Sequence, residues 1–232
     1  MIIAFLGGIG SGKSASMAKR IVNSPYYCYS NMHVNAVNHE RIKISDIVKT
    51  EKEENGKKIK EIKKVNWEFW ENNLEQKGEY HIFLDEVHNI LSPRQSMSKW
   101  NVLAGQWLTQ IRKLLGDSEE TNLYIGSQTI NSIEKILKGI IHMIIYCEKR
   151  EDRSQKIYTY CMNRYNKVEV KLCYPTYIIE HLFIDKRTGS AIDKFYRFLD
   201  GAKSYNFRLQ SFVNPYFKYY NTKQLFKETA YI

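Results

Sequence analysis

The sequence predicts an α/β fold of three layers, in which helices cover both faces of a central, mostly parallel sheet. Three observations predict it. Short, unbroken apolar segments such as residues 2–6 (IIAFL) are typical of strands that are buried on both faces. Segments with apolar residues at helical spacing alternate with these strands as far as residue 147. A glycine-rich segment joins the first strand to the first helix.

Length and composition fit one such domain with an extension. The chain has 232 residues, of which 43% are hydrophobic and 26% charged. Its formal net charge of +10 favours a polyanionic partner, although a solubilising surface of mixed lysine and glutamate could also carry it. None of the four cysteines forms a CxxC pair or lies at finger spacing from a histidine, so we expect no zinc site and a reducing cytoplasm, that of the host if the chain is viral. No segment reaches the roughly 18 apolar residues of a membrane span, so no intrinsic span is expected.

The first elements follow in order from the amino terminus. Residues 2–6 form the first predicted strand, and residues 13–22 form a helix that ends at Asn23-Ser24-Pro25 because proline cannot continue it. Residues 26–34 (YYCYSNMHV) are aromatic and β-branched, which favours a second strand.

A charged insertion is expected over residues 48–64. It contains KTEKEENGKKIKEIKK, in which the pair Asn55-Gly56 favours a hairpin turn. We expect a protruding two-stranded ribbon or a mobile loop. Either a DNA-contacting arm or a solvated insertion without a function would fit this composition.

Helices and strands continue to alternate after the insertion. The predicted elements are a helix over 67–78, a strand over 80–86, a helix over 101–115, a strand over 122–127, a short helix over 130–137 and a strand over 140–147. We therefore expect one core domain over residues 1–150, which includes the charged insertion. Residues 151–232 are expected to form a β-hairpin (157–165 and 168–174) and an aromatic extension packed on the core. The aromatic residues would pack a subdomain or subunit interface, or stack on bases.

The motif GxxxxGK[ST] is satisfied by Gly7, Gly12, Lys13 and Ser14, between a buried strand and a helix. Glycines permit positive φ, so that successive N–H groups can point inward around phosphates at the helix N-terminus. Lys13 is expected to reach the β- and γ-phosphates of ATP, and the Ser14 hydroxyl to bind Mg²⁺. The residues expected to contact the nucleotide are Gly7, Gly8, Ile9, Gly10, Ser11, Gly12, Lys13, Ser14 and Ala15.

Two adjacent acids end the strand YHIFLDE. Asp85 would lie at the carboxyl edge of the sheet, where open α/β sheets bind ligands, and would hold Mg²⁺. Glu86 would polarise the water that attacks the γ-phosphate. The alternative is that both acids form a helix N-cap cluster.

Further candidates complete the predicted hydrolytic site. Gln128 follows the strand over 122–127 and is expected to contact the γ-phosphate or the attacking water, unless it is only a strand-end turn residue. Arg112 and then Arg94 are candidates for an arginine that stabilises the transition state in a neighbouring subunit. Each is also typical of an ordinary surface arginine.

These residues resemble the FtsK–HerA branch of ASCE-type P-loop NTPases, and within it the zonula occludens toxin (Zot)-like and viral DNA-packaging ATPases. The likeness rests on four segments: YYCYSNMHV, whose strand ends at Asn31; IFLDEVHNIL; QIRK followed by NLYIGSQ; and NPYFKYYNTKQLF, where Asn221 stands in place of a common aspartate. The resemblance implies that the Gln128 strand lies between the P-loop strand and the Asp85 strand. It also implies a hexameric or pentameric ring completed by a neighbour's arginine.

Three functions fit these observations. The first is an ATP-hydrolysing motor that translocates double- or single-stranded DNA, for viral genome packaging or virion assembly with a capsid or virion protein. The second is a Zot-like ATPase for filamentous virion extrusion or protein secretion, tethered to a membrane by a partner. The third is a small-molecule P-loop kinase, which would not need Glu86 beside Asp85.

Overall fold

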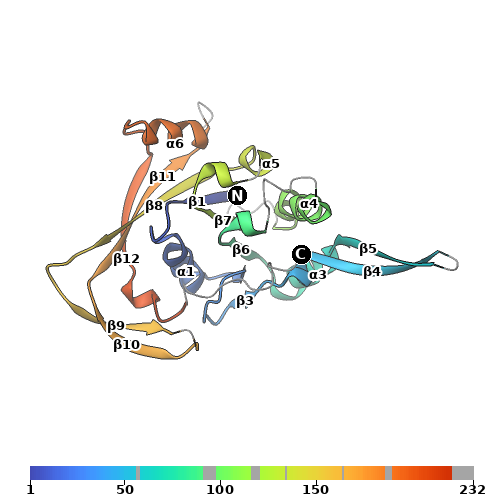
Figure 1. Cartoon of the computed structure of the whole chain (residues 1–232), viewed down its shortest axis with the longest axis horizontal. Coiled ribbons are helices and arrows are strands. Elements are labelled where there is room, and N and C mark those ends of the chain that lie inside the picture. Colours follow the sequence, from blue (N-terminus) through green and yellow to red (C-terminus); the bar gives the residue numbers. More distant parts are fainter. Residues whose placement is uncertain are drawn as a thin grey trace.

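The structure, a computed structural model, describes residues 1–55, 58–90, 98–115, 121–133, 135–163, 165–185 and 190–220. Among these residues, eight strands form the central sheet in the order β12-β11-β8-β1-β7-β6-β2-β3 (Figure 1). From β8 to β3, every strand runs parallel to its neighbours. These strands are β1 (Ile2–Leu6), β2 (Tyr27–Ser30), β3 (His39–Arg41), β6 (Tyr80–Leu84), β7 (Leu123–Ser127) and β8 (Met143–Glu151).

The order of the central strands confirms the expectation drawn from the family resemblance. Strand β7 pairs with β1 on one side and with β6 on the other. All five residues of β1 and of β6 are buried, as their unbroken apolar sequences predict. The carboxyl ends of these three strands therefore meet at one edge of the sheet.

Two antiparallel strands extend the sheet beyond β8. Strand β11 (Thr176–Ile184) pairs with β8 along its whole length, and β12 (Phe207–Phe212) pairs with β11 at the outer edge. Residues beyond 150 thus contribute strands to the same sheet that carries the glycine-rich loop. The sequence patterns did not predict this pairing.

Helices cover the two faces of the sheet, in agreement with the predicted three layers. Helix α1 (Lys13–Asn23) packs on one face through Ala15, Met17, Ala18 and Ile21. On the other face lie α3 (Trp67–Lys77), α4 (Lys99–Leu114) and α6 (Ala191–Leu199), centred on a second apolar cluster. In that cluster the fully buried rings of Trp70 and Trp107 lie 5.3 Å apart.

The short helix predicted over residues 130–137 is instead divided. A 3₁₀ turn, η3, covers Ile130–Ser132, and α5 covers Lys135–Lys138. The Thr129 side chain accepts a hydrogen bond from the backbone N–H of Ser132, which caps the first turn.

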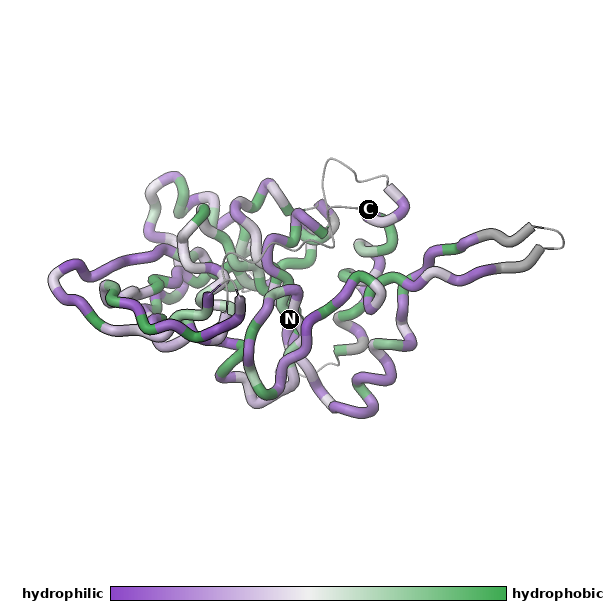
Figure 2. Tube along the Cα trace, turned by 60° about the horizontal axis from the view of Figure 1, so that its bottom comes forward, coloured by the Kyte–Doolittle hydropathy of each residue, from purple (hydrophilic) through white to green (hydrophobic). Residues whose placement is uncertain are grey.

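The charged insertion forms the predicted two-stranded ribbon, β4 (Val48–Asn55) with β5 (Lys58–Val65), which extends away from the body (Figures 1 and 2). At its base Glu51 pairs with Lys49 at 3.1 Å and with Lys64 at 3.0 Å. Much of the charge at the base of the ribbon is therefore matched within it. Along the chain, the short helix α2 (Ile44–Ile47) precedes the ribbon, and α3 follows it.

A second ribbon, β9 (Ile157–Met162) with β10 (Val168–Cys173), confirms the predicted hairpin and lies at the opposite end of the molecule (Figure 1). Asn166 has a φ of 60°, the left-handed conformation common in tight turns. The 3₁₀ turn η4 (Asn214–Tyr216) packs the hairpin against the body, and the Thr159 hydroxyl donates to the carbonyl of Asn214. Within the described ranges, no helix combines the length and apolar character needed to cross a membrane.

Candidate functional site

The glycine-rich loop between β1 and α1 has the backbone that the motif predicts. Gly7 and Gly12 have φ values of 146° and 93°, a region that residues with a Cβ rarely adopt. A Cβ on Gly7 would lie 2.6 Å from the carbonyl oxygen of Cys147, and one on Gly12 would lie 1.9 Å from Ile178 Cδ1. The loop therefore packs closely against β8 and β11 at these two positions, where the positive φ also disfavours a side chain. Ile9, at the tip, is 88% exposed.

Lys13, the first residue of α1, is turned back over this loop. Its side chain is 5% exposed, and its ammonium donates to the carbonyl of Gly7 at 2.8 Å and to that of Gly8 at 3.4 Å. The same Nζ lies 3.9 Å from Glu86 Oε1. The ammonium thus lies between the loop and the acids that end β6.

Ser14, in α1, and Asp85, directly after β6, are in direct contact. The Ser14 hydroxyl donates to Asp85 Oδ2 at 2.5 Å. A hydroxyl and a carboxylate at this separation are the oxygen ligands that a hard cation such as Mg²⁺ prefers. In the part of the chain that the structure describes, no cluster of three His, Cys, Asp or Glu side chains forms an all-protein metal site. Ser14 and Asp85 are thus two residues of this edge that could ligate a magnesium ion.

Asp85 is fixed in place by Asn31, at the end of β2. The Asn31 amide donates to the Asp85 carbonyl at 2.7 Å, and its oxygen accepts the Asp85 N–H at 2.8 Å. On the other side, a Cβ on Gly126 would lie 2.6 Å from Asp85 Oδ1. The sequence drew attention to Asn31 only as the residue that ends the strand. Its two bonds to Asp85 could not be inferred from that pattern.

Glu86 adopts a left-handed backbone, with φ 50° and ψ 52°, which costs a residue with a side chain about 1–3 kcal/mol. Its N–H donates to Asp85 Oδ1 at 3.0 Å. Its carboxylate lies 3.3 Å from His88 Nδ1, and the side chain of Gln128 is close enough to affect its pKa. Burial, and then the charge of Asp85, raise the pKa of Glu86, while Lys13, His88 and Gln128 oppose that rise.

The structure thus brings together Lys13, Ser14, Asp85, Glu86 and Gln128 at the carboxyl edge of β1, β6 and β7. His88 was not among the predicted site residues. Its contact with Glu86 depends on the tight 3₁₀ turn η1 (Val87–Asn89), which begins directly after the acids. Nothing in the spacing of the sequence indicates where that turn directs the imidazole.

Other predicted site residues have different positions. Ala15 is 3% exposed and packs in the apolar cluster between α1 and the sheet. Arg112 belongs to the last turn of α4, and its side chain is not among those that the structure describes. Arg94 and Asn221 lie outside the described residues.

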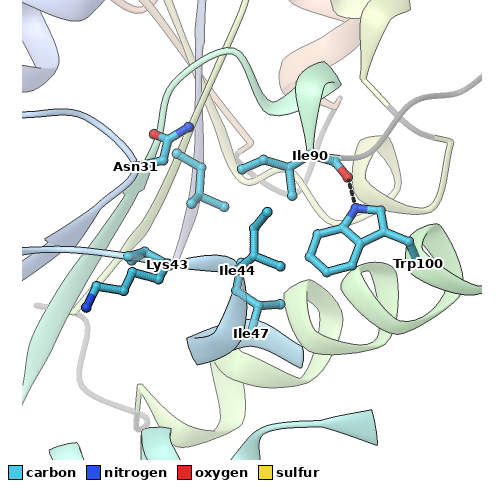
Figure 3. A pocket seen from close by; sticks show the side chains of 8 residues that line it. Asn31, Lys43, Ile44, Ile47, Ile90 and Trp100 are labelled. Carbon is cyan, nitrogen blue, oxygen red and sulfur yellow. Dashed lines mark hydrogen bonds between the residues drawn. The ribbon is translucent and has the colours of Figure 1, made fainter. Parts of the chain in front are cut away.

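A small apolar pocket lies behind Asn31 rather than over the glycine-rich loop. Figure 3 shows Ile44, Ile47 and Ile90 converging near the ring of Trp100, whose indole N–H donates to the carbonyl of Ile90 at 2.7 Å. Its other lining residues are Asn31, Ile42, Lys43 and Leu84. Six of these eight lining residues are apolar or aromatic, which does not suit phosphate.

No protein-family model matches the sequence, and no curated protein matches it. Among solved structures, the N-terminal domain of zonular occludens toxin from Neisseria meningitidis is similar, with a TM-score of 0.50 and 12% identity over 95% of this chain and 98% of that one. The genome packaging NTPase B204 from Sulfolobus turreted icosahedral virus 2, in complex with ATP-gammaS, matches with a TM-score of 0.40 and 12% identity over 62% of this chain and 74% of that one. The chain therefore has a three-layer α/β fold of the P-loop NTPase type, similar to that of the zonular occludens toxin domain.

Proposed function

We propose that this chain is an ATPase that hydrolyses ATP to ADP and phosphate with Mg²⁺ at the edge of the sheet. One observation carries the proposal: Lys13, Ser14, Asp85 and Glu86 converge there. The ammonium of Lys13 lies 3.9 Å from Glu86, and the hydroxyl of Ser14 lies 2.5 Å from Asp85. A kinase for small acceptors would not need a second acid held over the phosphate loop.

Each residue has a separate proposed role. Lys13 leaves the loop carbonyls to pair with the β- and γ-phosphates, and Ser14 and Asp85 hold the metal. A bound Mg²⁺ would neutralise part of the charge on the phosphate oxygens. Glu86 accepts a proton from the attacking water, and its raised pKa makes it a better base than an exposed glutamate. The Gln128 amide, which lies near Glu86 directly after β7, orients that water.

Phosphate release by purified protein with ATP and Mg²⁺ tests this proposal. Lys13→Ala should lower the rate by about 10²–10³-fold, as expected for the loss of a group that stabilises developing charge. Glu86→Gln should lower it by about 10²–10⁴-fold and leave nucleotide binding in place, because only the base is lost. Lys203→Ala removes an exposed lysine beyond α6 and should match the unmodified chain. Equal rates for all three variants would refute the site.

We further propose that hydrolysis drives movement along DNA, as in viral genome packaging or virion assembly. The net charge of +10 and the sequence resemblance to packaging ATPases support this substrate. Contacts between basic side chains and DNA are made to the phosphate backbone, and they weaken as the salt concentration rises. Double- or single-stranded DNA should therefore stimulate phosphate release at low salt and lose this effect at high salt. Hydrolysis that DNA leaves unchanged at every salt concentration would contradict the motor.

We propose that the motor is a homo-oligomeric ring of five or six subunits, in which Arg112 or Arg94 reaches a neighbour's site. Mixing of two inactive variants tests this arrangement. Lys13→Ala subunits lack a working phosphate site but keep the arginine, whereas Arg112→Ala subunits lack only the arginine. If the arginine acts between subunits, the mixture should hydrolyse ATP although neither variant does so alone. A mixture as inactive as its components would exclude Arg112, and Arg94→Ala would then be tested in the same way.

A protein-handling ATPase, as in filamentous virion extrusion or secretion, is the second candidate. The β9–β10 hairpin favours it, because one face is apolar and open to solvent. Tyr158 is 78% and Tyr160 57% exposed, and they pair across the strands with Leu172 and Val170, which are 55% and 61% exposed. Such a face suits a protein partner better than DNA phosphates. Tyr158→Ser with Tyr160→Ser should abolish capture of a capsid or virion protein, and this result together with hydrolysis insensitive to DNA would favour this function.

A further inference from the structure

A buried ion pair ties the helix after the phosphate loop to strand β11. Glu180, near the middle of β11, is 2% exposed. Both of its oxygens accept hydrogen bonds from the guanidinium of Arg20 on α1, at 2.8 Å and 2.7 Å. This two-pronged geometry is the most directional form of a charged contact, so it fixes the orientation of α1 as well as its distance from β11.

The same carboxylate also reaches the first turn of the helix. The Ser16 hydroxyl, which is 1% exposed, donates to Glu180 and accepts from Arg20 at 2.6 Å. Ser16 lies two positions after Ser14. The guanidinium of Arg20 also lies over the ring of Phe5 in β1, 4.9 Å from its centre. The network therefore connects β1, β11 and the first two turns of α1.

The loop itself rests on the same strand. Ile178, two residues before Glu180 and on the same face of β11, fills the space where a Cβ of Gly12 would lie. Gly7 lies against the carbonyl of Cys147, which is paired with Glu180 in the register of β8 and β11. The beginning and the end of the loop thus contact two neighbouring strands, and Glu180 is next to both contacts.

The charge on Glu180 is maintained in this setting. Burial alone would raise the pKa of its carboxyl group, but the hydrogen bonds and charge of Arg20 and the hydrogen bond from Ser16 hold the pKa below its usual value. Burying two charges carries a large desolvation cost, and apolar residues of similar volume often give equal stability. Stability alone is therefore a poor explanation of this ion pair. Its two-pronged geometry does, however, fix the orientation of α1 relative to β11.

We propose that Glu180 is a positioning residue for the phosphate loop. Through Ser16 and Arg20 it sets the orientation of the first two turns of α1, and hence where Lys13 and Ser14 present their ammonium and hydroxyl. The effect on hydrolysis rests on the proposed function. The effect on the loop is a property of the fold and can be measured without nucleotide.

Three variants separate positioning from stability. Glu180→Gln keeps the volume but leaves the buried charge of Arg20 without its carboxylate. The double variant Arg20→Met, Glu180→Leu removes both charges and both ends of the tie, and the Ser16 hydroxyl can then bond to its own helix. Tyr29→Phe is the control, since it removes a buried hydrogen bond from Tyr29 to Asn73 on β2 and α3, away from the loop.

The measurements are thermal unfolding, amide hydrogen exchange of peptides covering residues 7–23 without nucleotide, and kcat and KM for ATP. Glu180→Gln should speed exchange in these peptides and lower kcat/KM about tenfold or more, because small displacements of reacting groups reduce rates strongly. The double variant should unfold within about 3 °C of the unmodified chain and still show fast exchange and a low kcat/KM. Tyr29→Phe should lower the unfolding temperature without changing either readout.

Two results would overturn the proposal. In the first, the double variant recovers kcat/KM together with stability, which would make the pair purely structural. In the second, Glu180→Gln exchanges like the control over residues 7–23. If the unmodified chain does not hydrolyse ATP, the proposed function fails, and the exchange comparison still decides whether Glu180 holds the loop.

Discussion

Gly126→Ala adds a single methyl group behind Asp85, the proposed metal ligand. Gly126 lies in β7, and the new Cβ would be 2.6 Å from Asp85 Oδ1, 3.2 Å from Asp85 Cα and 3.2 Å from Met17 Sδ. None of these atoms can move freely. Asn31 holds the backbone of Asp85, Ser14 holds its carboxylate, and Met17 is fully buried in the core.

The expected loss is the difference between two effects. Overpacking of this kind costs about 1–3 kcal/mol. Replacing glycine by alanine restricts the unfolded chain and returns about 0.4–1 kcal/mol. The net destabilisation should be about 1–2 kcal/mol, which for a chain of this size lowers the midpoint of thermal unfolding by roughly 2–8 °C. The rate of phosphate release should also fall, by more than the loss of folded protein explains, because Asp85 must shift away from Ser14.

Circular dichroism melting and a phosphate-release assay measure the two effects. Gly105→Ala is the matched control: it makes the same change within helix α4, where nothing lies within 4 Å of the new Cβ. That control should stabilise the chain by about 0.5–1 kcal/mol and leave hydrolysis unchanged. If Gly126→Ala is as stable and as active as Gly105→Ala, Asp85 is not held against β7 and the description of the acid site is wrong.

Three further predictions concern single contacts. Asn31→Asp keeps the shape but replaces the donor to the Asp85 carbonyl with a carboxylate, so it should cost about 1–3 kcal/mol and reduce phosphate release, as melting and activity assays would show. The lowered pKa of Glu180 means that its pairing with Arg20 stabilises the fold above the ordinary value of 4.5 and is lost as the pH falls through the lowered pKa. In urea unfolding, the unmodified chain should have a larger free energy of unfolding than Glu180→Gln, and this difference should shrink at acidic pH. A difference that is the same at every pH would contradict the pairing of an ionised Glu180 with Arg20. Asn214→Ala removes a buried side chain that accepts a hydrogen bond from the Thr176 N–H at 2.5 Å. The change should lower the free energy of unfolding by about 1–3 kcal/mol in the same assay. A much smaller loss would show that this hydrogen bond does not hold the start of β11 in place.

Much of the parallel core could be predicted from the sequence because its signals are local. An apolar strand, a glycine-rich turn and an amphipathic helix follow one another within residues 2–23. The charged hairpin was recognisable because Asn55-Gly56 lies between two alternating segments. The strand order β1-β7-β6 came from the family resemblance, since no pattern within one segment specifies which distant strand it will join.

The antiparallel extension could not be predicted in this way. No strand was predicted over the residues of β11 (TYIIEHLFI), and its pairing with β8 depends on contacts between segments far apart in the chain. The same limit applies to the site. Glycine and acid motifs indicate Lys13 and Asp85, whereas the support from Asn31 and the left-handed turn at Glu86 arise only after folding.

The contact between Ser16 and Glu180 joins residues 164 positions apart. On a ribosome, the phosphate loop would emerge well before β11, the strand against which it packs. A nascent chain could complete α1 and most of the parallel sheet while Gly12 and Arg20 still lacked their partners from β11. The loop would therefore reach its final packing only after β11 has been synthesised, and a fragment that stops at β8 would contain the whole sequence motif without the strand that packs against it.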